Sequence, residues 1–175
     1  NAELNNTTNW TATTGTIASV GENPYEGHRA WKVTDPGSGV ADVYITDGAP
    51  TELVGKTVTF TAYVRTNDTD DTVKIYIKDS EGITKSTGRT AISYAQETVT
   101  HTVHKDATYV RYGIEVTGDG LNNKYAYADQ LEVRNYSDNL IHAIFGRGLY
   151  VWDESTDVWD ALYIDTNFDA TSLVE

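Results

Sequence analysis

Hydrophobic and polar residues alternate along several stretches of this chain. Residues 57–65 read Thr-Val-Thr-Phe-Thr-Ala-Tyr-Val-Arg, so that every second side chain is apolar, and the same period occurs at 73–78 and 109–116. Successive side chains of a strand point to opposite faces of a sheet, so each of these stretches predicts a half-buried β-strand. Shorter runs rich in β-branched and aromatic residues, which predict further strands, are 30–34, 40–46, 98–103 and 125–133.

Turn-forming pairs separate these stretches, for example Asp47-Gly48, Glu81-Gly82 and Asn122-Asn123. No part of the chain sustains a 3.6-residue hydrophobic period over three helical turns. Seven or more short strands, each with one polar face, predict an all-β fold, an antiparallel β-sandwich, and exclude an α/β enzyme fold.

The composition narrows the function classes. With 175 residues, the chain has room for one ordinary domain and a short appendage. It has no Cys and no Met, which excludes disulfides and thiolate metal sites. Its formal net charge of −13 makes nucleic acid and anionic membranes unsuitable partners. No apolar run approaches the length of a membrane span, so we expect no membrane insertion.

The charge is concentrated near the C-terminus. Residues 138–175 hold eight acidic residues and one basic residue, a net charge of −7 out of −13. We therefore divide the chain into a β-sandwich domain at 1–136 and an acidic C-terminal arm at 137–175. Two apolar runs around an acidic turn predict that the arm is a β-hairpin. Its apolar side chains need cover from the sandwich or from another subunit, because a lone hairpin is marginally stable. The side chains that we assign to an assembly role are Phe145, Trp152, Trp159 and Tyr163.

Residues suited to catalysis are few. The four His are scattered, and no hydrolase, metalloprotease or nucleotide-binding motif is present, so the sequence predicts a protein that is not an enzyme. Asp129 is the acid with the most unusual position, since it lies inside the apolar run 125–133. A carboxylate in such a strand needs a partner or must face solvent.

Four segments carry a resemblance to a known group of proteins. They are Asn1–Asn5 with Trp10, Gly27–Val33, Leu53–Arg65 and Tyr125–Val133. Together they resemble the strands of jelly-roll carbohydrate-binding modules (families 4, 9, 16 and 22 and their relatives). The resemblance covers residues 1–134 and does not extend to 138–175. It implies that the sandwich is a jelly roll of two antiparallel sheets.

The same resemblance implies a structural calcium ion that joins the first strand to the last. On the family pattern, Asp129 is the C-terminal ligand, and Glu3 or Asn5 lies on the N-terminal side. This chain has Gln130 where the family often has a second Asp. The alternative for Asp129 is a carboxylate that accepts hydrogen bonds from backbone donors.

Sugar binding in such modules uses aromatic rings that stack on the apolar face of a pyranose, beside side chains that bind its hydroxyls. Residues on the polar sides of the long predicted strands fit this description. An alternative is that these Tyr residues only stabilise cross-strand pairs. The candidates are Tyr63, Arg65, Tyr76, Tyr109, Arg111 and Tyr127, with Lys74 and Glu115 beside them.

Two functional classes follow from the sandwich and the arm together. The arm is similar to short hairpins in bacteriophage tail and head appendage proteins. The first class is therefore a non-enzymatic structural or adhesive protein of a virion, a tail or capsid appendage that self-associates or binds another structural protein through the arm. Host-surface oligosaccharides are its expected ligands, and its location is extracellular or on the virion surface.

The second class is a carbohydrate-binding module of a secreted glycoside hydrolase. An extracellular filament subunit that exchanges the arm as a donor strand is a variant of the first class. Carbohydrate-binding modules of glycoside hydrolases usually end in a tether rich in Pro, Gly, Ser or Thr. All three Pro of this chain lie at or before position 50, which favours the virion class.

Overall fold

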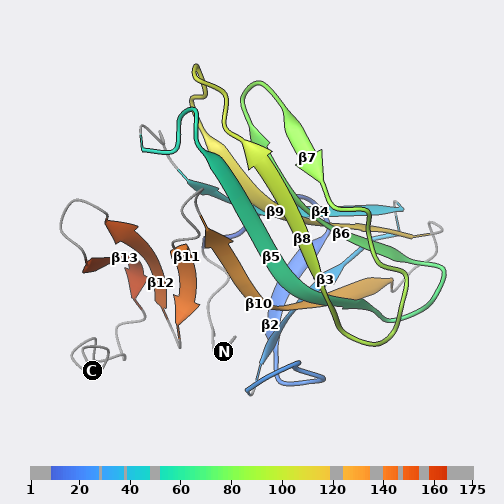
Figure 1. The fold of residues 1–175 in the computed structure, drawn as a ribbon. Helices are drawn as coiled ribbons and strands as arrows, with labels where there is room; N and C mark the ends of the chain where they lie inside the picture. The colour runs from blue at the N-terminus through green and yellow to red at the C-terminus, as the bar shows by residue number, and fades with distance from the viewer. Residues whose placement is uncertain are drawn as a thin grey trace.

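The computed structural model describes residues 9–27, 29–37, 39–47, 52–118, 124–134, 140–145, 148–153 and 158–164, and from residue 140 onward it describes the backbone alone. Within these ranges the chain forms thirteen β-strands and no helix (Figure 1). Accordingly, the described residues include no helix that could span a membrane.

The strands are short, and the two longest have ten residues each. In chain order they are β1 (Thr11–Thr14), β2 (Thr16–Val20), β3 (Ala30–Thr34), β4 (Val40–Asp47), β5 (Thr57–Thr66), β6 (Thr72–Asp79), β7 (Ile83–Lys85), β8 (Ala95–Thr102), β9 (Val110–Thr117), β10 (Tyr125–Arg134), β11 (Leu140–Phe145), β12 (Gly148–Asp153) and β13 (Val158–Ile164).

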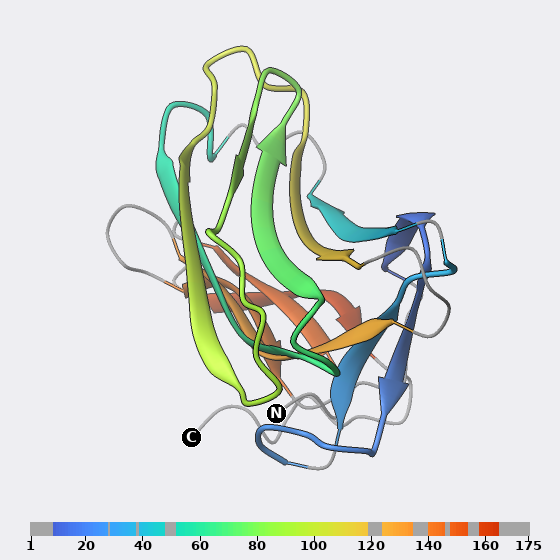
Figure 2. The same ribbon diagram turned by 90° about the vertical axis from the view of Figure 1, so that its right-hand side faces the viewer.

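These strands form two antiparallel sheets that make a sandwich (Figures 1 and 2). One sheet has five strands in the order β1-β4-β9-β6-β7. The other has eight strands, in the order β13-β12-β11-β10-β3-β2, with β5 paired to β10 and β8 paired to β5. The predicted all-β sandwich is therefore confirmed.

The core lies between the sheets and follows the predicted alternation. In β5, Val58, Phe60, Ala62 and Val64 are all buried, while the residues between them lie on the other side of the strand. β6 and β9 contribute their own alternate residues to the same cluster, among them Ile114. Trp31 is 1% exposed and belongs to this core.

Two large buried side chains lie outside this core cluster, one on the outer side of each sheet. Tyr76 of β6 is 3% exposed, and Tyr127 of β10 is 1% exposed. Neither belongs to the cluster between the sheets. Their burial therefore depends on neighbours on the outer faces, which are the faces that can meet a ligand.

β10 joins the main sheet to the C-terminal strands. Along one edge, its residues Tyr125–Ala128 pair with β3, and its residues Glu132–Arg134 pair with β11. Along the other edge it pairs with β5, with an irregularity between Asp129 and Glu132. Gln130 has a positive φ of 48° at this point, which marks a bulge in the strand.

The C-terminal strands continue the eight-stranded sheet. β11 pairs with β12, and β12 pairs with β13 through the predicted hairpin. The sequence predicted two strands in the arm, whereas its described residues form three, because the first predicted run contributes both β11 and β12. In Figure 1 the three strands extend the sheet outward from β10, and β13 is its last strand.

Candidate functional site

The candidate sugar-binding residues fall on the outer faces of the two different sheets. The structure places Tyr76 and Arg111 on the five-stranded sheet, with Tyr109 directly before β9, and it places Tyr63, Arg65 and Tyr127 on the eight-stranded sheet. The two groups therefore form two separate surfaces. We call them the β9 face and the β5 face, after a strand that carries candidate residues on each.

The β9 face is a grid of side chains from three paired strands. Across β4, β9 and β6, the antiparallel register aligns Asp42 with Glu115 and Lys74, Tyr44 with Gly113 and Tyr76, and Thr46 with Arg111 and Lys78. Most of the residues that lie between these positions along each strand belong to the core, as Ile114 does. Carboxylates, aromatic rings and cations therefore occupy successive rows of one surface.

Arg111 lies between two aromatic rings on this face. The guanidinium carbon is 4.3 Å from the ring centre of Tyr44 and 4.4 Å from that of Tyr109. Such cation–π contacts hold the guanidinium in place without using its hydrogen-bond donors. Its Nε has no hydrogen-bond partner among the described residues.

Tyr76 lies across Gly113, its direct neighbour on β9. A Cβ atom at position 113 would collide with the Tyr76 ring, so only glycine leaves room for it. The Tyr76 hydroxyl donates a hydrogen bond of 2.6 Å to Oδ1 of Asp42 on β4. Burial, together with this hydrogen bond, raises the pKa of Tyr76 well above its ordinary value. The phenol therefore stays a neutral donor that fixes one carboxylate oxygen of Asp42.

Glu115, which lies opposite Asp42 on this face, forms an ion pair with Lys85 of β7. Nζ of Lys85 lies 2.5 Å from Oε2 of Glu115, whose side chain is 17% exposed. Aromatic surface, two carboxylates and a guanidinium are thus gathered on one face. These are the groups that can stack on a sugar ring and pair with its hydroxyls.

The β5 face is more closely covered. Tyr127 lies between Lys32 of β3 and Arg65 of β5 in the strand register. The Arg65 guanidinium carbon is 4.4 Å from the Tyr127 ring centre, and Lys32 Nζ is 4.0 Å from that of Tyr125. Tyr127 therefore offers no open ring, and its burial raises its pKa.

Tyr63 on the same face is stacked against Tyr25, a residue of the β2–β3 loop. The two ring centres are 4.0 Å apart, and the ring planes differ by 12°. Tyr25 is 41% exposed, so the outer ring of this stack is the accessible one. Sequence reasoning included Tyr63 and missed its partner, because a loop residue has no periodicity that would assign it to a face.

Asp129 is fully buried beside this stack. Its Oδ2 accepts hydrogen bonds from the backbone N–H groups of Tyr25 (2.9 Å) and Glu26 (3.1 Å), and its Oδ1 accepts one from Gln130 (2.8 Å). These are the backbone donors that the sequence analysis gave as the alternative to calcium.

The calcium prediction remains untested by this arrangement. Glu3 and Asn5, its other predicted ligands, lie outside the described residues. Within the described part of the chain, no three His, Asp or Glu residues form a group that could hold a metal. Both carboxylate oxygens of Asp129 accept hydrogen bonds from backbone N–H groups. A calcium ion bound there would need several further oxygen ligands, since calcium takes six to eight. The calcium site therefore stays a prediction.

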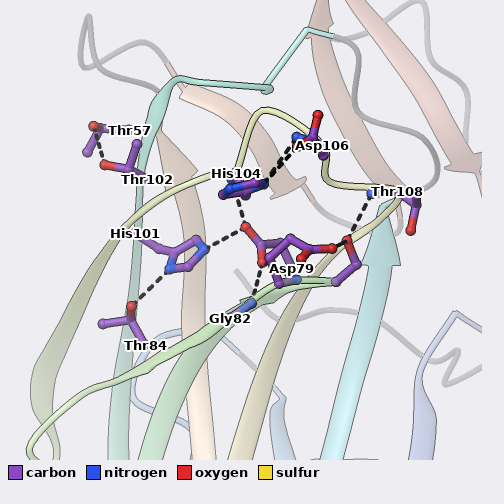
Figure 3. A network of polar contacts seen from close by, with 11 residues as sticks. Thr57, Asp79, Gly82, Thr84, His101, Thr102, His104, Asp106 and Thr108 are labelled. Atoms are coloured by element: carbon purple, nitrogen blue, oxygen red, sulfur yellow. Dashed lines mark hydrogen bonds and ion pairs between the residues drawn. The ribbon is translucent and has the colours of Figure 1, made fainter.

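A separate polar network lies at the β6–β7 turn (Figure 3). Asp79 Oδ1 accepts from the backbone N–H groups of Glu81 and Gly82, and Oδ2 accepts from the N–H of His104 at 2.8 Å. Nε2 of His101 lies 3.0 Å from Oδ2. Burial of this carboxylate raises its pKa, but these hydrogen bonds outweigh that effect and lower the pKa of Asp79 to about 2.

This network connects the β6–β7 turn to the segment that follows β8, where His104 lies. Nδ1 of His101 lies 2.9 Å from Oγ1 of Thr84, so the imidazole bridges β7 to the turn that carries Asp79. In serine hydrolases Nδ1 faces the carboxylate and Nε2 the hydroxyl, which is the reverse of the order here. With Asp79 only 1% exposed, the arrangement is suited to structural stabilisation.

The assembly residues of the arm lie in described strands, but their side chains do not belong to the described part of the structure. Phe145 is in β11, Trp152 in β12, and Trp159 and Tyr163 in β13. Their role in assembly remains a prediction.

Comparison with known proteins supports the fold. No family model matches the chain, and no curated protein matches it. Among solved structures, it is similar to the C-terminal family 22 carbohydrate-binding module of Clostridium thermocellum Xyn10B, with a TM-score of 0.61 and 13% identity over 79% of this chain and 93% of that one. It is also similar to the CBM22-1 xylan-binding domain of Paenibacillus barcinonensis Xyn10C, with a TM-score of 0.58 and 12% identity over 77% and 90%.

A third similar structure is the enzymatically active domain of tailspike protein 4 from bacteriophage CBA120. The TM-score is 0.52 at 16% identity, over 78% of this chain and 20% of that one. At such identities the likeness establishes the fold alone. The predicted resemblance to jelly-roll carbohydrate-binding modules is confirmed at that level.

Proposed function

We propose that this chain is a non-enzymatic module that binds an oligosaccharide across the β9 face. The observation that carries the proposal is the Arg111 guanidinium held between the rings of Tyr44 and Tyr109, on the same face as Asp42 and Glu115. Stacking holds the guanidinium in position, so the face is ordered before a ligand arrives, which reduces the entropic cost of binding.

The chemistry of the face favours a polyhydroxylated ligand. Carboxylates accept hydrogen bonds from sugar hydroxyls, and the guanidinium donates to them. The Nε of Arg111 is buried and has no hydrogen-bond partner in the described part of the chain, so the donors that a ligand can meet are those of the guanidinium end. The net charge of −13 disfavours a polyanionic glycan. A neutral oligosaccharide is therefore the expected class.

Isothermal titration calorimetry with a defined panel tests this proposal. The fold relatives include a module described as xylan-binding and one solved with β-1,4-galactotriose, so xylohexaose and β-1,4-galactotriose are the first probes. Replacement of Arg111 by Ala should weaken binding by about tenfold or more, since a hydrogen bond to a charged group contributes roughly 1.5–3 kcal/mol.

Arg134→Ala provides the matched control. Arg134 is an arginine of β10 on the other sheet and pairs with Glu132 at 3.0 Å, so its loss should leave the affinity unchanged. Equal affinities of the wild type and Arg111→Ala for a bound probe would contradict the proposal.

We propose in addition that the protein is a virion appendage in which β11–β13 form the assembly element. The observation that favours this role is the position of β13 as the last strand of the eight-stranded sheet, paired there with β12. The outer edge of such a strand can pair with another chain. The likeness in fold to a phage tailspike domain supports the same role. It would place the protein outside the cell or on the virion surface.

Light scattering tests the assembly role. The full chain should form a defined oligomer, and a chain that ends at Asn135 should be a monomer that still gives the circular dichroism spectrum of a folded β-sheet protein. Two monomers would contradict the assembly role and favour a module of a secreted glycoside hydrolase. A filament whose length grows with concentration would favour donor-strand exchange.

A further inference from the structure

The β5 face carries an exposed aromatic stack that the proposed binding site does not use. Tyr25 lies outermost, parallel to Tyr63, and Tyr94 of the β7–β8 connection meets Tyr25 at an angle of 59° with ring centres 5.5 Å apart. We call these three residues the Tyr25 cluster. With 41% of its surface exposed, Tyr25 is one of the few large hydrophobic residues open to solvent among those described.

The loop that carries Tyr25 is anchored to β10. The backbone N–H groups of Tyr25 and Glu26 both donate to Oδ2 of Asp129, which is fully buried. On the other side, the Tyr94 hydroxyl donates a hydrogen bond of 2.7 Å to the carbonyl oxygen of Asn23. A charge-assisted anchor and a side-chain hydrogen bond thus fix the position of the outer ring.

Arg65 holds the second loop in the same place. Its Nη1 donates to the carbonyl oxygen of Ile92 at 3.1 Å, and its guanidinium lies 5.5 Å from the Tyr94 ring centre. The same guanidinium stacks on the buried Tyr127. Two loops that are distant in the sequence are therefore tied to one sheet and to each other at the Tyr25 cluster.

Polar groups border the exposed ring. Glu26 follows Tyr25 in the chain, and its carboxylate accepts a hydrogen bond from the side-chain amide of Gln130. Gln130 owes this position to the bulge in β10, where its φ is positive. A carboxylate and an amide next to an apolar ring can pair with hydroxyl groups at the edge of a stacked sugar.

We propose that the Tyr25 cluster is a second carbohydrate-binding site, which takes one neutral pyranose unit stacked on the outer ring of Tyr25. A preorganised ring avoids the cost of ordering a loop on binding. The open area of one tyrosine, on the order of 100 Å², suits a single sugar. It is far below the roughly 800 Å² per partner of a stable protein interface. The site does not rest on the β9 face, because the two surfaces belong to different sheets.

Two sites on different sheets would let one module contact a glycan-bearing surface at two points. Linked sites of this kind raise the apparent affinity for a multivalent surface without any new contact.

Nuclear magnetic resonance of the tyrosine ring signals can follow the two sites separately. The full chain is titrated with xylohexaose and with β-1,4-galactotriose. We expect saturable shifts of the Tyr25, Tyr63 and Tyr94 signals, in addition to those of Tyr44 and Tyr109. Tyr25→Ala should reduce the affinity at the cluster by about tenfold and leave the shifts of Tyr44 and Tyr109 intact.

Two control variants distinguish ring stacking from nonspecific apolar contact. Tyr25→Phe keeps the ring and should bind as the wild type does. Ile92→Ala removes another exposed apolar side chain, 58% exposed on the neighbouring loop, and should also bind normally. If Ile92→Ala weakens binding as much as Tyr25→Ala, a general apolar patch accounts for the binding and the second site is overturned.

The titration separates the failure of each proposal. Shifts of Tyr44 and Tyr109 without shifts of the Tyr25 cluster overturn the second site and leave the proposed function standing. Shifts confined to the Tyr25 cluster support the second site and overturn binding at the β9 face. An absence of shifts with both probes overturns both.

Discussion

Asp79 gives the sharpest prediction about stability. Its side chain is 1% exposed, and its pKa is lowered from the ordinary value of 3.8 to about 2. Each unit of pKa change corresponds to about 1.36 kcal/mol, so the ionised carboxylate contributes roughly 2 kcal/mol to the free energy of unfolding. A group with a depressed pKa contributes this stability above its unfolded-state pKa and loses it as the pH falls toward the folded-state value. The loss should therefore occur between about pH 4 and pH 2.

Asp79→Asn removes this charge with almost no change in shape. The amide can accept hydrogen bonds at one atom only, so it leaves backbone N–H groups of Gly82 or His104 without an acceptor. We expect the variant to lose roughly 2 kcal/mol at neutral pH. It should also show a weaker pH dependence than the wild type between pH 4 and pH 2.

Urea denaturation followed by tryptophan fluorescence, repeated from pH 2 to pH 7, measures this effect. Asp106→Asn is the matched control, since the Asp106 side chain is 62% exposed, and its curve should follow that of the wild type. The wild type and Asp79→Asn differ by one titrating group, so the contributions of the other acids cancel in the difference. Parallel curves for these two proteins would refute the reasoning.

Three further predictions concern the core, the β9 face and the metal. Ile114→Ala should reduce the free energy of unfolding by about 2–5 kcal/mol, because this side chain is fully buried, and a loss below about 1 kcal/mol in urea denaturation would contradict the packing. Gly113→Ala should cost about 1–3 kcal/mol and weaken sugar binding, because the new methyl group displaces Tyr76, whereas Gly82→Ala, where a Cβ has space, should change neither. If calcium binds near Asp129, the melting temperature should rise with added calcium and fall on chelation, and an unchanged value would leave Asp129 held by its backbone donors alone.

The strands were predictable because their signal is local. The alternation in β5 and β9 identifies which residues face the core, and the structure confirms it at Phe60 and Ile114. For Asp129 the sequence left two alternatives, a buried carboxylate with a partner or one that faces solvent, and the structure has the first.

The division of the candidate residues between two faces was not predictable. Alternation assigns Tyr63 and Arg111 to polar sides of their strands, but it does not say which strands pair. Pairing and register are long-range properties, and here they align Tyr44 and Tyr76 on either side of Gly113. Tyr44 was within reach of the sequence, because it alternates with the apolar Val43 and Ile45.

The burial of side chains on the outer faces of the sheets could not be predicted from the sequence either. Tyr127 alternates like an exposed residue, yet it is 1% exposed because Arg65, Lys32 and neighbouring rings cover it. Tyr25 shows the opposite behaviour, since it lies in a loop without periodicity and becomes the exposed member of a stack. Contacts between a loop and a sheet depend on side chains that are distant in sequence, so no local pattern reports them.

The most direct test of the proposed function is a map of backbone amide shifts in the isotopically labelled chain during titration with xylohexaose and β-1,4-galactotriose. Binding across the β9 face predicts that the largest shifts occur in β4, β9 and β6, centred on Arg111 and Gly113, and that Arg111→Ala raises the sugar concentration needed to saturate them by about tenfold or more. Saturable shifts that leave these three strands unchanged, or an absence of shifts with both sugars, would contradict it.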